Sequence, residues 1–353
     1  MSRLRILHVV FSSRLAGSER YCIDLASRQA EEGHDVHVAG MRGTPIPTAL
    51  DPRVTFHGFA TRFFRRFLLR RLAVKLGADV CHGHLSADCK ALGRMSDVCA
   101  TVATLHVGYK AHQHAELDGL ICVNRTQVGR LAGYHGLVRT IPNWMPQPSM
   151  ETSSTGIRKE LGLGEDVFLV GAVGRLHPSK GMDVLISAFR ASAPARAALV
   201  ILGDGPQRAA LEILRANDPR IHLLGYRPVV HSCLRDLDLF VSPSREESFG
   251  LAIIEAMSTG ARIIATATEG PGGFLLDHPV ALVPPDSVEA LAYEIRAAHE
   301  QYCTVGLPRI GYDLSLFDPA PRLANIMDFY GQVLLAGQRS PARQKVPGMA
   351  VAT

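Results

Sequence analysis

The chain has 353 residues, of which 47% are hydrophobic and 20% charged, and its formal net charge is +5. This length suggests about two domains, and this composition is that of a globular protein able to bury a core in each. The positive charge favours anionic partners such as phosphates or an acidic membrane. Aromatic residues make up only 6%, so we expect no nucleic-acid partner.

Two further features narrow the class of protein. The amino-terminal apolar run Ile6–Phe11 is too short for a signal-peptide core, and no run of about 18 apolar residues follows that could span a bilayer. The seven cysteines are odd in number and contain no C-x-x-C pair, which disfavours a zinc or redox motif. We therefore expect reduced, buried thiols in a cytoplasmic protein.

Short apolar runs alternate with helical patterns along the chain. The first run, Ile6–Phe11, leads into a loop at Ser12–Gly17 and a helical stretch from Ser18 to Glu32. Further strands are expected at Asp35–Ala39, Val80–His82, Val102–His106, Gly119–Val123, Val167–Val173, Ala198–Leu202, Ile221–Leu224, Leu239–Ser242 and Arg262–Ala265. Such alternation predicts an α/β fold with doubly wound parallel sheets that helices cover on both faces.

A stretch rich in proline, serine and threonine separates two such series. It contains Pro142, Pro146, Pro148 and Ser149–Gly156, and it predicts an interdomain linker. We therefore expect one domain over residues 1–150 and a second from residue 151. The tail over residues 336–353 is rich in proline, arginine and small residues, and it is predicted to be disordered.

The most informative motif is S-P-S-R-E-E-S-F-G-L-A-I-I-E-A-M-S-T-G, Ser242–Gly260. A strand ends at its start, and a helix begins near Leu251, just after Gly250. Backbone N–H groups at such a helix start attract phosphate or sugar oxygens. Glu247 and Glu255, eight residues apart, can point into one crevice and accept hydrogen bonds from sugar hydroxyls. A helix-capping pair on a solvated face is the alternative.

A second motif, G-R-L-H-P-S-K-G, follows the predicted strand Val167–Val173 and covers Gly174–Gly181. Arg175 and Lys180 then lie in the loop at the carboxyl end of that strand. An arginine fork and a lysine point charge together suit a pyrophosphate. A solvated basic loop is the alternative.

Signals in the first half are sparser. Gly17 follows the first strand and permits close approach of a ligand, but no G-x-G-x-x-G is present, which disfavours a nicotinamide dehydrogenase. His82 and His84 end one predicted strand, and His106 ends another. Histidines in such places bind sugar hydroxyls or metals, or form hydrogen-bonded scaffold. For His82 and His84 we expect scaffold.

The stretch A-T-R-F-F-R-R-F-L-L-R-R-L-A-V-K, Ala60–Lys75, alternates basic with apolar residues. As a helix it would be basic and amphipathic, a form that suits an anionic membrane surface. A helix that packs its apolar side on the sheet and leaves the basic side in solvent is the alternative.

Taken together and in this order, the motifs resemble the retaining glycosyltransferases of family 4. The resemblance rests on Gly174–Gly181, Gly203–Pro206, Ser242–Gly260 and Thr268–Pro271, and in the first half on Gly17, Thr104–His106 and Ile141–Asn143. It implies a GT-B fold, in which two Rossmann-like domains face each other across a cleft. The second domain would cover residues 151–312, and the last helix, 313–335, would return to the first domain.

The resemblance also implies a nucleotide-sugar donor held mainly by the second domain, without a metal or another cofactor. The expected catalytic residues are Glu247, His106, Arg175 and Lys180, with Arg175 and Lys180 on the diphosphate and His106 beside the transferred sugar. The expected donor-binding residues are Gly17, Arg175, Lys180, Gly225, Tyr226, Arg227, Glu247, Ser248, Phe249, Gly250, Leu251 and Glu255. Glu255 would bind the ribose, and Gly225–Arg227 the base through main-chain contacts.

Some positions depart from the family pattern. One glycine, Gly17, stands where two are usual, Ser248 stands where glycine is common, and Asn143-Trp144 replaces Asn-Gly. None of these changes removes a charged group. Asp236-Leu237-Asp238 has the spelling of a metal-binding D-x-D, but it leads into a predicted strand and is expected to cap or pack locally.

The expected reaction is sugar transfer to a glycan or lipid-linked acceptor, with retention of configuration, in cell-surface polysaccharide or lipopolysaccharide synthesis. The enzyme would be cytoplasmic, at the inner face of the plasma membrane if Ala60–Lys75 contacts anionic lipid. The alternatives are a nucleotide-sugar epimerase of similar fold and a non-catalytic nucleotide-sugar-binding partner. The combination of Arg175, Lys180, Glu247 and Glu255 favours the transferase.

Overall fold

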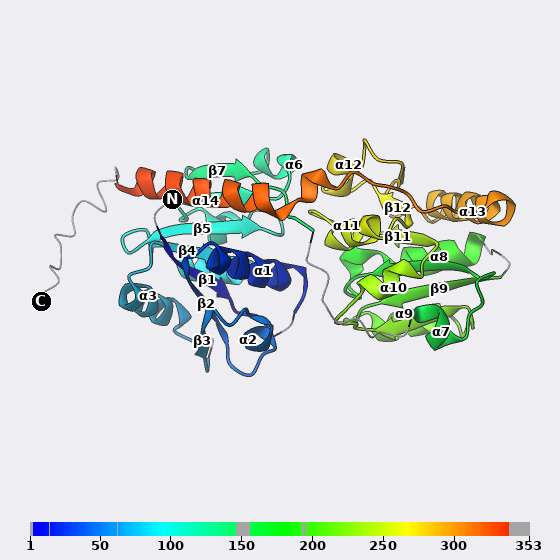
Figure 1. Ribbon diagram of the computed structural model, residues 1–353, viewed down its shortest axis with the longest axis horizontal. Helices are drawn as coiled ribbons and strands as arrows, with labels where there is room; N and C mark the ends of the chain where they lie inside the picture. The colour runs from blue at the N-terminus through cyan, green and yellow to red at the C-terminus, as the bar shows by residue number, and fades with distance from the viewer. Residues whose placement is uncertain are drawn as a thin grey trace, which may run out of the picture. The chain divides into compact units, whose positions relative to one another are not determined.

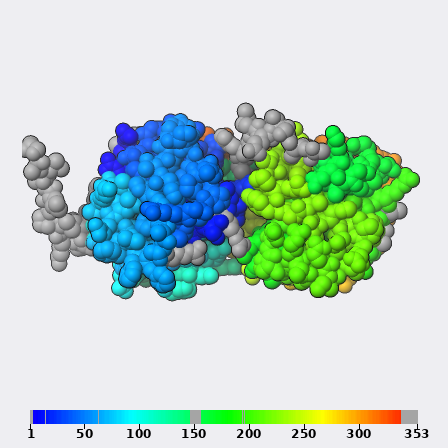
Figure 2. Space-filling view, turned by 90° about the horizontal axis from the view of Figure 1, so that it is seen from below, coloured from blue at the N-terminus to red at the C-terminus, as the bar shows by residue number. Residues whose placement is uncertain are grey.

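The computed structural model describes residues 3–13, 15–61, 63–145, 156–192, 194 and 196–338. The chain divides into two compact units: unit 1 comprises Met1–Pro146 and Asp318–Thr353, and unit 2 comprises Gln147–Phe317. In the space-filling view, the residues of each unit gather into a body of their own (Figure 2). Arg62, the linker residues 146–155 and the predicted tail from residue 339 lie outside the described residues.

Unit 1 is built on a seven-stranded sheet in which every pairing is parallel. Its strands are β1 (Arg5–Val10), β2 (Asp35–Met41), β3 (Thr55–Phe59), β4 (Val80–Gly83), β5 (Ala100–Leu105), β6 (Gly119–Cys122) and β7 (Leu137–Thr140). The spatial order is β3-β2-β1-β4-β5-β6-β7, so the direction of winding reverses between β1 and β4 (Figure 1). In register, Ile6 of β1 lies between Val36 of β2 and Val80 of β4.

Alternating residues of β1 show why helices cover both faces of this sheet. Leu7 and Val9 pack with α3 (Arg65–Leu76) and α4 (Ser86–Leu92), whereas Ile6 and Val10 point to the other face. There they pack with α1 (Gly17–Glu31), joined by α14 (Pro319–Gln338). Both sets of side chains are fully buried. The helices of unit 1 are α1 (Gly17–Glu31), α2 (Ile46–Ala49), α3 (Arg65–Leu76), α4 (Ser86–Leu92), α5 (Ala111–His114), α6 (Arg125–Val128) and α14 (Pro319–Gln338).

Unit 2 repeats this plan with six parallel strands. They are β8 (Phe168–Val173), β9 (Ala197–Leu202), β10 (Ile221–Gly225), β11 (Leu239–Ser242), β12 (Arg262–Thr266) and β13 (Ala281–Val283). The order β10-β9-β8-β11-β12-β13 reverses between β8 and β11. The helices are α7 (Ile157–Leu161), α8 (Met182–Ser192), α9 (Arg208–Leu214), α10 (His231–Arg235), α11 (Leu251–Ser258), α12 (Pro271–Phe274) and α13 (Val288–Val305), with 3₁₀ turns at Pro178–Lys180 and Ser315–Phe317.

The predicted doubly wound α/β class is confirmed, and each predicted strand is present within a few residues of its expected bounds. Three strands were not predicted: β3, β7 and β13. Each lies at an edge of its sheet, and most of their residues are only partly buried or exposed. An edge strand does not need the continuous apolar run that marks a strand buried on both faces, so its sequence signal is weak.

Two predictions from the sequence, on the cysteines and on the basic helix, are confirmed in part. In the described part of the chain, no helix is long and apolar enough to cross a membrane. Cys303 is exposed, and the other six cysteines are buried, all of them as free thiols. The predicted basic helix begins at Arg65 rather than near Ala60, because Phe64 before it has a positive φ of 56° that ends regular helical geometry.

Candidate functional site

The loops that follow β8 and β11 flank the point where the strand order of unit 2 reverses. Ligands of open α/β sheets bind in the crevice at such a point, outside the carboxyl ends of the strands. Lys180 in the first loop and Glu247 in the second form an ion pair, with 2.5 Å between Nζ and Oε2. Their side chains are 27% and 18% exposed, so the pair is accessible but partly shielded from solvent.

The two loops touch along their backbones. The N–H groups of Arg245 and Glu246 both donate to the carbonyl oxygen of Ser179, at 2.9 and 3.1 Å. Gly181 has a φ of +61°, and a Cβ atom on it would lie 2.0 Å from the carbonyl oxygen of Pro243. Only glycine fits this position, because any side chain would push the loops apart.

The main chain of Glu247 is held from the other side by the loop after β12. Its carbonyl oxygen accepts a hydrogen bond from the Gly270 N–H at 2.9 Å, and the Thr266 hydroxyl donates to the Ser244 carbonyl oxygen at 2.5 Å. Glu247 is therefore carried by a loop that is tied to the loops on both sides of it. Gly270 belongs to the T-E-G-P motif, which thus contributes this contact.

Helix α11 begins directly after this loop. Gly250 precedes it with a φ of +98° and, being a glycine, offers no side chain to cap the N-terminus. The Ile253 N–H already donates to the Gly250 carbonyl oxygen at 2.9 Å, whereas the N–H groups of Leu251 and Ala252 precede the first such bond and suit an anionic oxygen. Glu255 lies one turn into the helix and is partly buried, as is Ser248 before it. Phe249 is buried against Phe274 and Phe317, which anchors the loop.

The remaining predicted residues of unit 2 lie at the carboxyl ends of β8 and β10. Arg175 is exposed, and its side chain has no ion pair among the described residues. Gly225 ends β10 and accepts a hydrogen bond from the Gly203 N–H at 2.8 Å. Tyr226 is exposed. The Arg227 guanidinium forms an ion pair with Glu160 of α7, with 2.5 Å between Nη2 and Oε1. Its side chain therefore has a partner already, and its main chain is the part left for the predicted contact with the base.

The D-x-D sequence packs locally, as expected. Asp238 accepts hydrogen bonds from Arg158 and from the Leu169 N–H, both at 2.7 Å, and Asp236 accepts from the Arg158 N–H at 3.2 Å. Burial raises the pKa of the Asp238 carboxyl above its usual value. These carboxylates stand at the amino end of β11, which is the opposite edge of the sheet from the Lys180–Glu247 pair.

In unit 1, Gly17 is the first residue of α1 and is exposed. It follows β1, beside the reversal of strand order between β1 and β4. The preceding Ala16 N–H donates to the Glu19 side chain at 3.1 Å, which satisfies one donor at the start of the helix. Gly17 and His106 thus belong to unit 1, and the other predicted site residues belong to unit 2.

A buried cluster of three histidines, His8, His82 and His84, adjoins His106 through His84. The Nε2 atom of His8 is hydrogen-bonded to Gln29 at 2.7 Å, and the Nδ1 atom of His8 is hydrogen-bonded to His84 at 3.0 Å. His82 bonds the Tyr330 hydroxyl at 2.6 Å and Thr104 at 2.9 Å. His82 and His84 are therefore hydrogen-bonded scaffold, as the sequence predicted. Burial lowers the pKa of His8 to about 4, and it lowers the pKa values of His82 and His84 well below their usual value.

His106 lies at the end of β5 and is partly exposed, although its Nε2 atom is buried without a hydrogen-bond partner among the described residues. Its ring stacks on His84, with centroids 5.8 Å apart, and it meets the Tyr21 ring edge to face, with centroids 4.8 Å apart. Desolvation lowers its pKa to about 3. At neutral pH this imidazole is uncharged, so it offers hydrogen bonds rather than a positive charge.

Sequence reasoning missed the side chains that hold this histidine. Tyr21 is buried between His106 and Trp144, with the Trp144 ring 4.5 Å away, and the Trp144 indole N–H donates to Asp24. Trp144 is the chain's only tryptophan and one of the departures from the family pattern, and this departure could have pointed to a role for Trp144 near the site.

The structure of α3 shows the packing that the alternative interpretation of the basic stretch predicts, and it also leaves apolar side chains exposed. Leu69 and Ala73 are buried in the core, so one face packs on the sheet. Phe63 and Phe64, just before the helix, are 78% and 82% exposed, and Phe67 is exposed as well. Arginine side chains surround these phenylalanines in the sequence. We call residues 63–75 the α3 surface.

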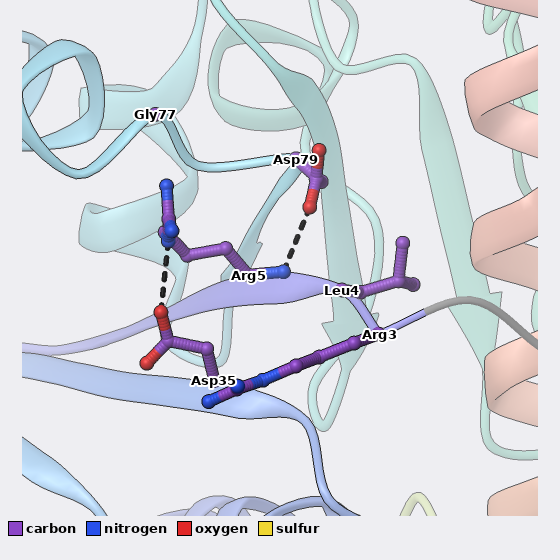
Figure 3. A pocket seen from close by; sticks show the side chains of 6 residues that line it. All are labelled: Arg3, Leu4, Arg5, Asp35, Gly77 and Asp79. Atoms are coloured by element: carbon purple, nitrogen blue, oxygen red, sulfur yellow. Dashed lines mark hydrogen bonds and ion pairs between the residues drawn. The ribbon is translucent and has the colours of Figure 1, made fainter.

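An open pocket of about 410 Å³ lies at the opposite edge of the unit 1 sheet, where β1 and β2 begin. Figure 3 shows the residues that line it: Arg3, Leu4, Arg5, Asp35, Gly77 and Asp79. The Arg5 side chain is paired with Asp35 at 2.8 Å, and the backbone N–H of Arg5 donates to the Asp79 carboxylate at 2.7 Å. Three of the polar lining residues, Arg5, Asp35 and Asp79, are therefore joined to one another, and none of the predicted site residues lines the pocket.

Comparisons with known proteins cover both units. Residues 15–146 match the family model described as Glycosyltransferase Family 4, and residues 167–301 match the one described as Glycosyl transferases group 1. The chain is 30% identical over 178 residues to a lipopolysaccharide core biosynthesis mannosyltransferase, LpsB, of Rhizobium meliloti (46% of this chain, 48% of the relative). It is 33% identical over 169 residues to a putative teichuronic acid biosynthesis glycosyltransferase, TuaC, of Bacillus subtilis (46% and 41%).

These alignments span less than half of either curated relative. Among solved structures, Anabaena Alr3699/HepE in complex with UDP-glucose is similar over 94% of this chain and 100% of that one, with a TM-score of 0.77 and 20% identity. At this identity the likeness concerns the fold. The structural match extends over both units, whereas the sequence matches to the curated relatives are shorter.

Proposed function

Because the chain belongs to the family 4 glycosyltransferases, with their GT-B fold of two Rossmann-like domains, we propose that it transfers a sugar from a nucleoside-diphosphate sugar to a glycan or lipid-linked acceptor. The observation that carries this proposal is the Lys180–Glu247 pair, which stands at the strand-order reversal of unit 2. A cation for phosphate and a carboxylate for sugar hydroxyls are thus held side by side, next to the uncapped start of α11.

The donor's diphosphate is bound by positive groups from three places. Lys180 has three N–H donors, and Glu247 takes up only part of them, so a phosphate oxygen can be added without removing the ion pair. Arg175 contributes an uncommitted fork, and the first turn of α11 contributes backbone N–H groups. As the sugar leaves, negative charge grows on the diphosphate, and these preorganised donors stabilise it. The reaction therefore proceeds without a metal.

The sugar is bound by acids and by a neutral histidine. Glu247 and Glu255 accept hydrogen bonds from sugar and ribose hydroxyls. His106 is uncharged, and its unpartnered Nε2 suits a hydroxyl of the transferred sugar. Gly17 lets the backbone before α1 approach the donor phosphate. Transfer retains the anomeric configuration.

The class of product is proposed from the relatives. LpsB and TuaC are named for lipopolysaccharide core and teichuronic acid biosynthesis, and the Anabaena protein was solved with UDP-glucose. These names support a uridine diphosphate sugar or a similar donor and an acceptor in cell-surface polysaccharide synthesis. Free thiols suit a reducing compartment, so we place this protein in the cytoplasm.

The direct test is a thermal-shift panel of uridine, guanosine and adenosine diphosphates and their sugars, in EDTA. We expect one base to raise the melting temperature by about 5–10 °C at a hundredfold excess over Kd, since binding then adds about 2.7 kcal/mol. Product analysis by mass spectrometry follows with the donor so identified. An epimerised donor would favour the epimerase, and binding with no turnover would favour a non-catalytic partner. A panel without any shift contradicts the proposal.

We also propose that the α3 surface contacts anionic lipid. The exposed Phe63, Phe64 and Phe67 can insert at the headgroup boundary, and the basic residues Arg65, Arg66, Arg70, Arg71 and Lys75 match an anionic leaflet. Arg70 is also paired with Asp97 at 2.5 Å, so its charge is partly committed.

Vesicle flotation tests this contact. We expect the protein to float with vesicles containing 30% phosphatidylglycerol at low salt, and Phe63→Ser/Phe67→Ser to lower the bound fraction several-fold through the loss of two inserting rings. Ile213→Ser, which removes a similarly exposed apolar side chain from α9 of unit 2, is the matched control and should float like the wild type. Absence of wild-type flotation at low salt contradicts the contact.

A further inference from the structure

Arg245 has more charged and polar partners than any role in the proposed reaction requires. Its guanidinium donates to both carboxylate oxygens of Asp183, with Nη1–Oδ1 at 2.9 Å and Nη2–Oδ2 at 2.7 Å. It also donates to Asp286 Oδ1 at 2.5 Å and to the Pro178 carbonyl oxygen at 2.6 Å. The Arg245 side chain therefore binds four acceptor atoms, while the backbone N–H of Arg245 donates to the Ser179 carbonyl oxygen.

These acceptors come from the segments that surround the candidate site. Pro178 lies in the 3₁₀ turn that ends at Lys180, and Asp183 is the second residue of α8, directly after that turn. Asp286 lies in the turn between β13 and α13. Since Arg245 precedes Glu247 by two residues, its bonds brace the Glu247 loop against the segments on both sides of Lys180. Together with the backbone contacts between the two loops, these side-chain bonds help to fix the separation of Lys180 and Glu247.

The chemistry of arginine suits this task. A guanidinium is planar and presents its donors in a fixed fork, so the Asp183 contact defines orientation as well as distance, which a lysine cannot do. The side chain is 27% exposed, and ion pairs with such access to water contribute little to global stability. Removal of Arg245 should therefore disturb geometry more than folding. The proximity of Arg245 also holds the pKa of Asp183 below its usual value, which keeps that partner ionised.

We propose that Arg245 is a positioning residue of the donor site: it holds the Glu247 loop against the Lys180 turn so that the cation and the carboxylate reach one donor molecule together. This inference rests on the proposed function, because it assigns Arg245 a role at the same site. It touches neither the diphosphate nor the sugar. Its effect reaches the reaction only through Lys180 and Glu247.

The test compares Arg245→Lys and Arg245→Ala with the wild-type full-length protein. We expect Arg245→Lys to keep the melting temperature within about 3 °C while kcat/KM for the donor falls about 100-fold, because a misplacement near 1 Å has that effect on catalysis. Arg245→Ala should recover part of its activity in 10–50 mM guanidinium chloride, roughly the range in which a small cation can refill the site without unfolding the protein. A double substitution with Asp183→Asn should be less than additive in kcat/KM, since both changes break the same fork.

Arg220→Lys is the matched control. Arg220 also forks onto one carboxylate, Asp218, at 3.0 and 2.8 Å, but it stands before the amino end of β10 in the same unit. Arg220→Lys should keep the wild-type kcat/KM for the donor and show no change in activity with guanidinium. The inference is overturned if Arg245→Lys retains wild-type kcat/KM, or if both substitutions reduce it only in proportion to lost folded protein. A wild-type protein that binds no nucleoside diphosphate overturns the proposed function itself, which the thermal-shift panel shows before any substitution is made.

Discussion

Replacement of Lys180 by alanine is expected to weaken nucleoside-diphosphate binding about 10- to 100-fold and to lower kcat/KM for the donor about 100- to 1000-fold. The first range corresponds to the loss of a charge-assisted hydrogen bond, and the second to the loss of one preorganised donor that stabilises charge in the transition state. Lys180 is the cation nearest to Glu247 at the strand-order reversal, and its flexible stem can follow the diphosphate as it leaves. Calorimetric titration and steady-state kinetics measure the two effects separately.

Glu247→Gln should lower turnover without weakening diphosphate binding, unlike Lys180→Ala. It keeps the size of the side chain but removes the negative charge 2.5 Å from the Lys180 ammonium, so diphosphate affinity should stay constant or rise while turnover falls. Lys159→Ala, which removes an exposed lysine from α7 of the same unit, is the control for loss of charge and should match the wild type. The phosphate assignment is wrong if Lys180→Ala binds the diphosphate as tightly as the wild type does.

Acidification is expected to unfold unit 1 first, between about pH 6.5 and pH 4. The lowered pKa values of the histidine cluster mean that the folded state stays neutral where the unfolded chain takes up protons. Stability is therefore complete above pH 6.5 and is lost as pH falls below it. For His8, whose folded pKa is about 4, the loss at pH 5.5 is about 1.4 kcal/mol. His82 and His84 add losses of the same sign, against a typical total stability of about 5–15 kcal/mol.

The single tryptophan makes this measurable unit by unit. Trp144 is buried in unit 1 beside Tyr21, so its fluorescence follows unit 1 alone, while far-ultraviolet circular dichroism follows the whole chain. Urea titrations from pH 5 to pH 8 should show the fluorescence midpoint fall steeply with acidification. His8→Gln should make that dependence shallower by about one proton, even if it lowers stability at pH 8. A fluorescence midpoint independent of pH would show that the buried histidines do not titrate on unfolding.

Interior strands were predictable because their signal is local. Residues 6–10 and Phe168–Val173 are largely buried on both faces, which favours an almost continuous apolar run, interrupted by His8 in β1, that can be recognised without knowing the neighbouring strands. The edge strands β3, β7 and β13 lack that burial and were missed. The loop residues Arg175, Lys180 and Glu247 and the helix residue Glu255 were also singled out locally, since each lies after a recognisable strand or within a recognisable helix.

What only the tertiary structure decided are contacts between distant segments. Lys180 and Glu247 are 67 residues apart, and they meet because β11 pairs with β8, which no local pattern states. The fork of Arg245 on Asp183 and the burial of three histidines under His106 depend in the same way on strand order. Local periodicity determines which residues enter a strand or helix, because it follows from backbone geometry and burial. Which charges become partners is determined by the spatial order of the strands in each sheet, because that order sets the distances on which electrostatic energies depend.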